Sequence, residues 1–235
     1  MITSATSNVT KAMESNDAFY DSIAADYDGL MTSADETARD VISRLFCSRV
    51  PIGKVLDFGS GTGLDLSWLV ASGYTVFSLE PSAGMRDEAK KRVSTIDGIK
   101  FIDESLDYRH WSETKLPISG ANGILANFAV LNCMDDLPGF FNKIRLVLDP
   151  NGRLVVTVID PGWHNVVKKY SYFVALRLLV QRELEVLRRH KGVYHKTYLY
   201  SKRFIEKVAH SVFILESCTP INGSGFVVLI FRPAR

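Results

Sequence analysis

The sequence predicts an α/β fold in which strands and helices alternate around a mostly parallel sheet. Short apolar runs at 54–58, 75–79 and 153–159 have the length and composition of buried strands, and stretches with helical periodicity separate them. The segment 55–63, VLDFGSGTG, leads from the first strand through three alternate glycines toward a helix at 64–71. A strand, a tight turn and a helix in this order are typical of the unit that builds a parallel α/β sheet.

The other elements follow from periodicity and turn signals. A helix is expected at 17–30 and a second at 33–48, where Ser33 and Glu36 have the spacing of a capping box. The remaining expected elements are a helix begun by Pro81 and Ser82, strands at 99–102 and 123–126, a helix at 135–148, a turn at 149–152, and closing strands at 211–218 and 226–231 around a turn at 223–225.

Composition limits the class of protein. With 235 residues, 46% of them apolar, the chain is long enough for one globular domain with an appended lid. No apolar stretch reaches the roughly 20 residues of a membrane span, and the first fifteen residues lack the apolar centre of a signal peptide. The three cysteines are widely spaced, which favours neither a disulfide framework nor a metal site, so we expect a reducing cytoplasm and no bound metal.

The charge is divided unequally along the chain. Residues 1–162 carry a net charge of −7 and residues 163–235 carry +9, although the whole chain has only +2. Blocks of opposite sign suggest that the two parts meet different ligands.

The glycine-rich turn is the first candidate binding site. Alternate glycines at Gly59, Gly61 and Gly63 allow a ligand to lie against bare backbone, beside the unpaired N–H groups of the following helix. A dinucleotide site is an alternative, but its usual G-x-G-x-x-G spacing would need a glycine where Leu64 stands.

A carboxylate follows at the spacing that a nucleoside site requires. Glu80 ends the predicted strand 75–79 and lies 21 residues after Gly59. A carboxylate at the tip of the second strand can accept hydrogen bonds from both hydroxyls of a ribose. The turn and Glu80 together therefore predict a nucleoside site.

The same residues carry a family resemblance. Gly59-x-Gly61-x-Gly63, preceded by Asp57, resembles the first motif of class I S-adenosylmethionine-dependent methyltransferases, and Tyr20-Asp21-x-Ile23-Ala24-x-x-Tyr27-Asp28 resembles the N-terminal helix of their small-molecule members. The resemblance implies a Rossmann-like sheet of seven strands with an antiparallel C-terminal hairpin, residues 1–50 as a helical lid and residues 51–235 as the methyltransferase domain. The periodicity of the chain itself adds an expected helical cap at 163–200 to that domain. The resemblance also implies S-adenosylmethionine as cofactor, contacted by Tyr20, Tyr27, Asp57, Gly59, Ser60, Gly61, Glu80, Pro81, Met85, Ser105, Leu106, Asn127, Phe128 and Asn132.

Two positions depart from the family pattern. The acidic residue expected near the adenine is displaced, because Asp103 and Glu104 lie one or two positions early, so the backbone of Ser105 or Leu106 is expected to replace it. The Phe-Asp pair that often begins the fourth strand is replaced by Ala121-Asn122.

Residues 163–200 lie outside the resemblance, which covers about 19–160 and 211–232. Apolar residues recur every three or four positions, which predicts one long or two short amphipathic helices over 164–189 with a basic opposite face. A solvated face, an anionic substrate, an acidic carrier protein and a membrane surface remain open as explanations of that charge. Nucleic acid is disfavoured because no aromatic stacking platform is interleaved with the basic residues.

The expected reaction is transfer of a methyl group to oxygen, nitrogen or carbon of a small-molecule acceptor, and its main demand is positioning. A base is needed only if the acceptor enters protonated. His164 is the first candidate, with Tyr27 as a second catalytic candidate beside the cofactor and His195 and Tyr198 as competitors for the role of base. The alternatives are a nicotinamide-dependent oxidoreductase and a relative that binds the cofactor without turnover.

Overall fold

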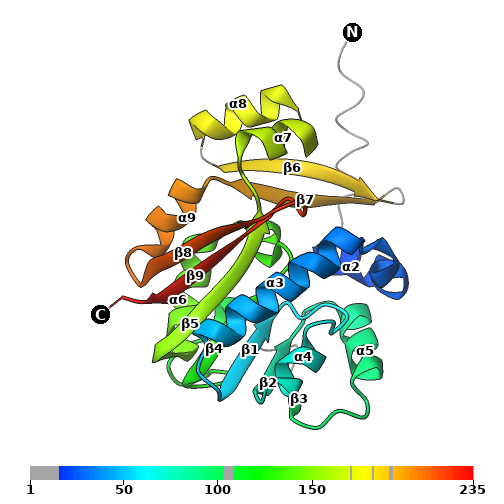
Figure 1. The fold of residues 1–235 in the computed structure, drawn as a ribbon, viewed down its shortest axis with the longest axis vertical. Helices are drawn as coiled ribbons and strands as arrows, with labels where there is room; N and C mark the ends of the chain where they lie inside the picture. Colours follow the sequence, from blue (N-terminus) through cyan, green and yellow to red (C-terminus); the bar gives the residue numbers. More distant parts are fainter. Residues whose placement is uncertain (1–15, 103–107, 170, 182, 191–192, 235) are drawn as a thin grey trace.

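The computed structural model describes residues 16–102, 108–169, 171–181, 183–190 and 193–234. Its centre is a seven-stranded sheet in the order β3-β2-β1-β4-β5-β9-β8 (Figure 1). The pairs among the first five strands are parallel, and β9 runs antiparallel to both β5 and β8. The strands are β1 (Lys54–Phe58), β2 (Thr75–Leu79), β3 (Ile99–Phe101), β4 (Ala121–Ala126), β5 (Leu148–Ile159), β8 (Phe213–Ile221) and β9 (Phe226–Pro233). The predicted Rossmann-like sheet with an antiparallel C-terminal hairpin is confirmed.

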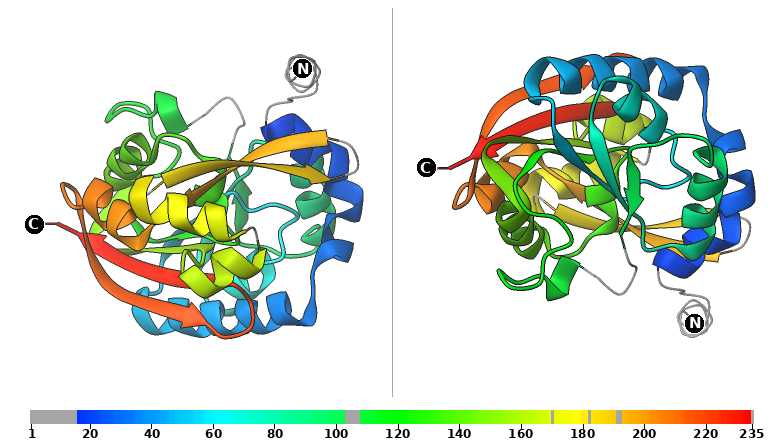
Figure 2. Two further views of the ribbon diagram at one scale, coloured as in Figure 1. Left: turned by 90° about the horizontal axis from the view of Figure 1, so that it is seen from above. Right: turned by 90° about the horizontal axis from the view of Figure 1, so that it is seen from below.

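Helices cover both faces of this sheet, with α3 on one side and α6 on the other (Figure 2). Val55 belongs to the apolar cluster under α3, whereas its neighbour Leu56 belongs to the cluster under α6, and both are fully buried. Central strands are therefore buried on both faces, which explains why they are continuous apolar runs rather than alternating ones. The helices of the two layers are α3 (Ser33–Arg49), α4 (Leu66–Ala71), α5 (Ala83–Arg92), α6 (Leu137–Val147) and α9 (Lys202–Ala209), with short 3₁₀ turns η3 (Tyr108–His110) and η4 (Val130–Cys133) between them.

Some boundaries differ from those expected. The first helix is α-helical only over α2 (Asn16–Ile23) and continues as the 3₁₀ helix η2 (Ala24–Leu30). The capping box of α3 is formed by Thr32 and Asp35, one residue earlier than expected: the N–H of Asp35 donates to Thr32 Oγ1 (3.3 Å) and the N–H of Thr32 donates to Asp35 Oδ2 (2.9 Å). The expected turn at 149–152 lies inside β5, where pairing with β4 skips from Leu148 to Arg153.

The segment after β5 corrects the expected all-helical cap. It forms two helices, α7 (Trp163–Lys169) and α8 (Tyr172–Gln181), and then an antiparallel ribbon of β6 (Glu183–His190) and β7 (Val193–Tyr200). Leu184 and Leu199, opposite one another in the ribbon, are buried against Leu178 of α8. The helical periodicity ends with α8, and alternation with period two takes over from Glu183, so extending the helix to residue 189 was wrong. No helix in the described part of the chain has the length and apolar character needed to cross a bilayer.

Candidate functional site

A cavity of about 870 Å³ opens at the carboxyl ends of the parallel strands. Its lining includes Gly59 after β1, Glu80 after β2 and Asn127 after β4. Strand order reverses at β1, which has β2 on one side and β4 on the other. Ligands of open α/β sheets bind at such switch points, because the loops on either side turn toward opposite faces of the sheet and leave a crevice.

The glycine-rich turn forms one wall of this cavity. Gly59, Gly61 and Gly63 all have positive φ, at 75°, 56° and 79°. A Cβ at Gly59 would lie 2.8 Å from Val130, and one at Gly63 would lie 3.0 Å from Ala89, so these two glycines allow close packing. A Cβ at Gly61 would meet nothing within 4 Å. Gly61 therefore presents bare backbone to the open cavity.

Glu80 connects this turn to the start of the next helix. Its Oε2 accepts the N–H of Gly61 at 2.7 Å, and its Oε1 accepts the N–H of Ser82 at 2.9 Å. Only 8% of Glu80 is exposed, and burial raises its pKa from 4.5 to about 7 despite the two hydrogen bonds. The turn and the carboxylate that the sequence paired by spacing are thus in direct contact.

Two residues predicted to contact the cofactor lie outside the cavity lining. Asp57 is 1% exposed, Oδ2 has no hydrogen-bond partner among the described residues, and burial raises its pKa well above the usual range. Asn132 is also 1% exposed: its Oδ1 accepts the N–H of Ile159 (3.0 Å) and its Nδ2 donates to the carbonyl of Tyr198 (2.6 Å). Asn132 therefore ties η4 to β5 and β7 and lies outside the cavity lining, so its contact with the cofactor stays a prediction that this geometry does not favour.

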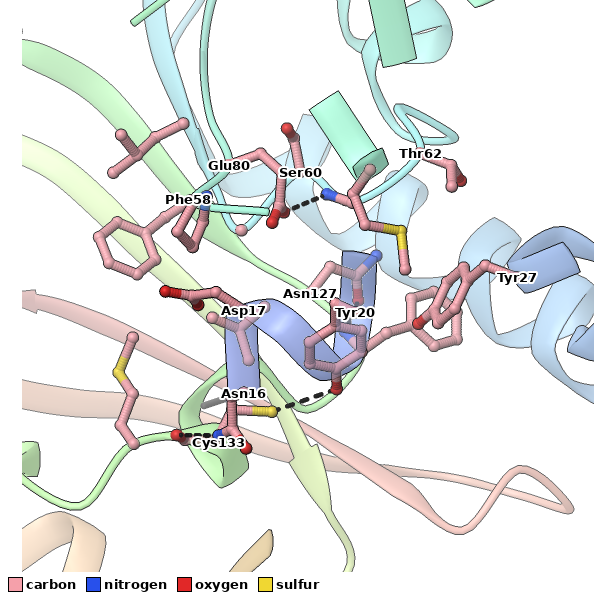
Figure 3. A pocket seen from close by; sticks show the side chains of 18 of the residues that line it. Asn16, Asp17, Tyr20, Tyr27, Phe58, Ser60, Thr62, Glu80, Asn127 and Cys133 are labelled. Carbon is pink, nitrogen blue, oxygen red and sulfur yellow. Dashed lines mark hydrogen bonds between the residues drawn. The ribbon is translucent and has the colours of Figure 1, made fainter. Parts of the chain in front are cut away.

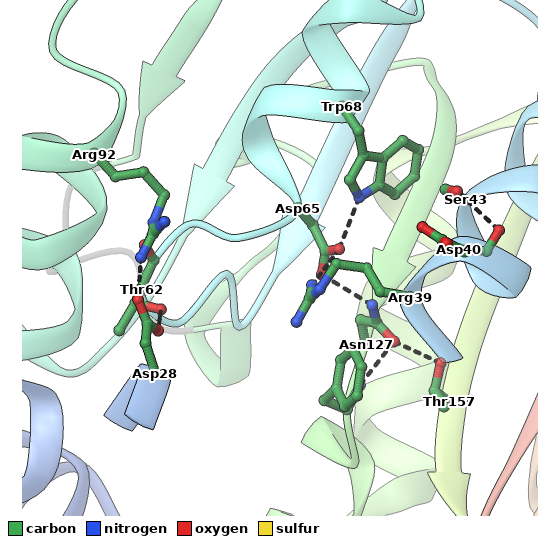
Figure 4. A network of polar contacts seen from close by, with 11 residues as sticks. Asp28, Arg39, Asp40, Ser43, Thr62, Asp65, Trp68, Arg92, Asn127 and Thr157 are labelled. Atoms are coloured by element: carbon green, nitrogen blue, oxygen red, sulfur yellow. Dashed lines mark hydrogen bonds and ion pairs between the residues drawn. The ribbon is translucent and has the colours of Figure 1, made fainter. Parts of the chain in front are cut away.

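A polar network of Arg39, Asp65, Trp68, Asn127 and Thr157 supports another part of the cavity wall (Figure 4). Asp65 pairs with Arg39 of α3 and accepts Trp68 Nε1 at 2.7 Å. Its second oxygen accepts Asn127 Nδ2 at 2.9 Å, and Asn127 Oδ1 in turn accepts Thr157 Oγ1 at 2.8 Å. The network joins α3, the glycine-rich turn, β4 and β5 around the cavity. The sequence signal for it was a single carboxylate, Asp65, within the otherwise apolar start of a helix.

The strand exit held by this network has an unusual backbone. Phe128 and Ala129 both have positive φ, 49° and 67°, a conformation that costs residues with a Cβ about 1–2 kcal/mol each. Asn127 Oδ1 accepts the N–H of Phe128 (2.9 Å), and the Arg39 guanidinium lies 4.5 Å from the centre of the Phe128 ring. These contacts hold Phe128 in the wall of the cavity.

Two carboxylates hold α2 and η2 against the glycine-rich turn and the loop after β2. Asp21 accepts Ser82 Oγ at 2.6 Å and the N–H of Gly84 at 2.8 Å, and the Ser82 bond lowers its pKa. Asp28 accepts Thr62 Oγ1 at 2.5 Å and pairs with Arg92 of α5. In the described structure, α2 and η2 are thus already docked on both loops that follow β1 and β2.

Tyr20 and Tyr27 lie together on this docked segment and line the cavity, with ring centres 6.2 Å apart. The hydroxyl of Tyr20 lies 3.3 Å from Cys133 Sγ. Burial raises the pKa of Tyr27 to about 12, and the Cys133 thiol together with burial raises the pKa of Tyr20 well above its usual range. Both hydroxyls stay protonated near neutral pH, which makes Tyr27 a hydrogen-bond donor rather than a base.

Most residues predicted to contact the cofactor line the cavity, and a few are not among the described residues. Those that line the cavity are Tyr20, Tyr27, Gly59, Ser60, Gly61, Glu80, Pro81, Met85, Asn127 and Phe128. Ser105 and Leu106 lie outside the described residues, and His164 lies in α7 with a side chain that is not described. Of the competing bases, Tyr198 lines the cavity, and His195 stacks on Phe19 with ring centres 4.0 Å apart.

A second group of lining residues was missed. Asn16 and Asp17 of α2 lie across the cavity from Glu80 and Ser60 (Figure 3), and Asn16 Nδ2 donates to the Cys133 carbonyl at 2.9 Å. Lys196, from the β6–β7 ribbon, also lines the cavity. These residues come from elements far apart in the chain, and no spacing rule connects them. Among the described residues, no group of three His, Cys, Asp or Glu side chains is placed to hold a metal ion.

Comparison with known proteins decides the family. Residues 31–208 match the family model described as a methyltransferase domain. The chain belongs to this methyltransferase family. It is 29% identical over 140 residues to an uncharacterised methyltransferase of Oceanobacillus iheyensis, a match that covers 59% of this chain and 56% of that protein. The chain therefore spans just over half the length of that curated relative.

Solved structures share the fold. The complex of DhpI with SAH superposes with a TM-score of 0.72 at 19% identity, covering 95% of this chain and 97% of that one. The 1,6-didemethyltoxoflavin N1-methyltransferase of Burkholderia thailandensis, solved with its substrate and S-adenosylhomocysteine, gives a TM-score of 0.65 at 16% identity, covering 93% and 87%. At these identities the likeness shows a common fold.

Proposed function

We propose that the protein transfers a methyl group from S-adenosylmethionine to a small-molecule acceptor. The observation that carries the proposal is the contact between Glu80 and Gly61 in an open cavity at the switch point of the sheet. The family match and the S-adenosylhomocysteine complexes of structures with this fold support it. The three free cysteines favour a reducing, cytoplasmic location.

The residues of the cavity fit the nucleoside part of this cofactor. The carboxylate of Glu80 has the chemistry and the strand-tip position to accept both ribose hydroxyls. Gly61 offers backbone without a side chain, and Met85 and Phe128 offer apolar surface for a purine. The methionine part would lie toward Tyr20 and Tyr27, whose aromatic faces favour a sulfonium cation. The carboxylates of Asp17 and Asp65, which also line the cavity, would favour it as well.

When bound, S-adenosylmethionine supplies a methyl group already activated by its sulfonium. The chain has then to orient the acceptor and exclude water, and positioning of this kind contributes roughly 7–11 kcal/mol. The docked α2 covers the cavity, and its own Phe19 and Ile23 are buried in a cluster with Met85 of α5. Tyr20 and Tyr27 keep their protons, so an acceptor that enters protonated must lose its proton to another group or to water.

The acceptor region is the part of the cavity away from Glu80. Asn16 from the lid, Cys133 from η4, and Lys196 and Tyr198 from the ribbon line it. Three separate elements therefore shape this end, and the cap that follows β5 contributes two of the four residues. Variation of that cap is the expected route to different acceptors on one fold.

A pair of matched glycine variants tests the proposal. Gly61 and Gly120 have similar φ, 56° and 63°, and a Cβ at either would meet nothing within 4 Å. Alanine should therefore strain both backbones alike, but only Gly61→Ala puts a methyl group into the cavity. By calorimetry we expect parent and Gly120→Ala to bind S-adenosylmethionine and S-adenosylhomocysteine but not NAD, with Gly61→Ala at least about tenfold weaker, equivalent to about 1.4 kcal/mol. Equal affinity of the two variants for S-adenosylmethionine, or tighter binding of NAD by the parent protein, would overturn the assignment of this cavity as the cofactor site.

A further inference from the structure

In the residues that the structure describes, the exposed large apolar side chains are concentrated on one helix. Nine large apolar residues are exposed in the described part of the chain, and five of them belong to the ten-residue helix α8. The five are Tyr172, Phe173, Leu176, Leu179 and Val180, with exposed fractions of 57%, 76%, 45%, 67% and 77%. Positions spaced by one, four, seven and eight residues share one side of a helix, so these residues form a continuous outward stripe. We call them the α8 stripe.

The opposite side of α8 already has its packing partners. Ala175 and Leu178 are 2% and 3% exposed and pack against Val166 of α7 and Leu184 of β6. The helix is thus apolar on nearly every side, a pattern expected of one that is covered all round. Figures 1 and 2 place α7 and α8 at the end of the molecule beyond the β6–β7 ribbon, so the α8 stripe faces away from the rest of the chain.

Charge distinguishes among partners that could cover this stripe. The chain from residue 163 onward carries +9, against −7 before it. Arg177 lies on α8 beside the stripe and is exposed, and Lys168 is exposed on the neighbouring α7. Lys202 and Arg203 of α9, which follows the ribbon in the chain, are exposed as well. The cap itself, residues 163–200, holds eight Lys or Arg residues against two Glu residues. A second copy would therefore bring two net-positive caps together, whereas an anionic surface would be attracted.

We propose that the α8 stripe docks on an anionic lipid bilayer, with α8 lying in the plane of the interface. Ten helical residues extend about 15 Å, which suits a helix resting on a bilayer and is too short for one crossing it. The neighbouring rings of Tyr172 and Phe173, with centres 6.3 Å apart, are of the type that enters the headgroup region. The apolar stem of Arg177 can follow the stripe while its guanidinium reaches lipid phosphate.

The test uses the full chain and lipid vesicles. Flotation would compare vesicles of phosphatidylcholine alone with vesicles containing about one third phosphatidylglycerol. Parent is expected to float with the anionic vesicles, and raising salt from about 0.1 M to about 0.5 M should reduce this several-fold because exposed charges are screened. The double variant Phe173→Ser with Leu179→Ser is expected to bind at least about tenfold more weakly, because two apolar side chains no longer leave water.

A matched control is an exposed apolar residue elsewhere on the molecule. Ile52 is 64% exposed and precedes β1, far from α8, so Ile52→Ser should bind vesicles like the parent. All substitutions are at exposed positions, and unchanged melting temperature and S-adenosylhomocysteine affinity will show that the double variant is folded. Equal flotation of parent and double variant would overturn the proposal. Failure of the parent protein to bind anionic vesicles at about 1 mM lipid would also overturn it. A third contrary result would be that the parent protein forms a dimer and the double variant is a monomer.

Discussion

Glu80→Gln should reveal the buried carboxyl through the pH dependence of stability. Burial raises the pKa of Glu80 from 4.5 to about 7 in the folded protein, so the folded state holds its proton over a range in which the unfolded chain has lost it. A group of this kind contributes stability that is complete below the unfolded pKa and is lost as pH rises through the folded value. For these two pKa values the parent loses about 2.5 kcal/mol between about pH 5 and about pH 8, at about 1.36 kcal/mol per unit.

Glu80→Gln has no carboxyl group at this position and so should not lose stability as pH rises through about 7. The variant also lacks a hydrogen bond of the parent protein. The amide oxygen of a glutamine can accept one of the two N–H groups, that of Gly61 or that of Ser82. The amide NH₂ then faces the remaining N–H, and two donors cannot bond to each other. This mismatch lowers the stability of the variant by about 1–3 kcal/mol. The informative quantity is therefore the change with pH of the difference between parent and variant. Urea unfolding at about pH 5, 6, 7 and 8 measures it. Glu113→Gln, at an exposed loop position, serves as the control.

The same titration should appear in ligand binding. If the ribose hydroxyls donate to Glu80, the ionised carboxylate is the binding form, and its fraction falls about tenfold between about pH 8 and about pH 6 for a pKa near 7. We expect the affinity of parent for S-adenosylhomocysteine to fall by about that factor relative to Glu80→Gln. A stability difference that stays constant within about 0.5 kcal/mol across this range would refute the reasoning about burial. A pH-independent affinity ratio would refute the contact with the ligand.

Three further predictions concern the network, the lid and the tyrosines. Asp65→Ala should lower the free energy of unfolding by about 3–5 kcal/mol, because it leaves the Arg39 guanidinium without its carboxylate partner. Urea unfolding measures this loss. The double variant Asp65→Ala with Arg39→Met should lose less than the sum of the two single losses. Removing residues 1–30 should leave a cooperatively folding domain with little methyl transfer, since α2 and η2 cover the cavity; full turnover in that truncation would contradict the lid. Tyr27→Phe should leave the shape of the pH–rate profile between about pH 6 and about pH 9 unchanged, because a pKa of about 12 keeps the parent hydroxyl protonated there, and a lost limb would show that this tyrosine titrates.

The sequence alone was sufficient for the sheet and for the contact between the glycine-rich turn and Glu80. Strand, glycine turn and helix are consecutive in the chain, so the position of Gly61 follows from local backbone rules. Glu80 follows from the same repeat, because parallel neighbouring strands end at one edge of the sheet and bring their tips together. Both inferences need only short-range pattern and the topology of one βαβ unit.

Side-chain direction and long-range pairing were decided by the tertiary structure. Asp57 and Asn132 lie in the segments that the sequence indicated, yet both side chains are buried outside the cavity lining, because packing on each side of the strand and of η4 sets where they point. The contact of Arg39 with Asp65 spans 26 residues, and Lys196 reaches the cavity only because the segment after α8 folds as a ribbon. Helical periodicity in α8 gave no sign of that change, since the ribbon depends on cross-strand pairing and on burial against the helices. The turn and Glu80 therefore follow from neighbouring elements of the chain, whereas the side of the cavity lined by Lys196 and Tyr198 forms only after distant segments have packed together.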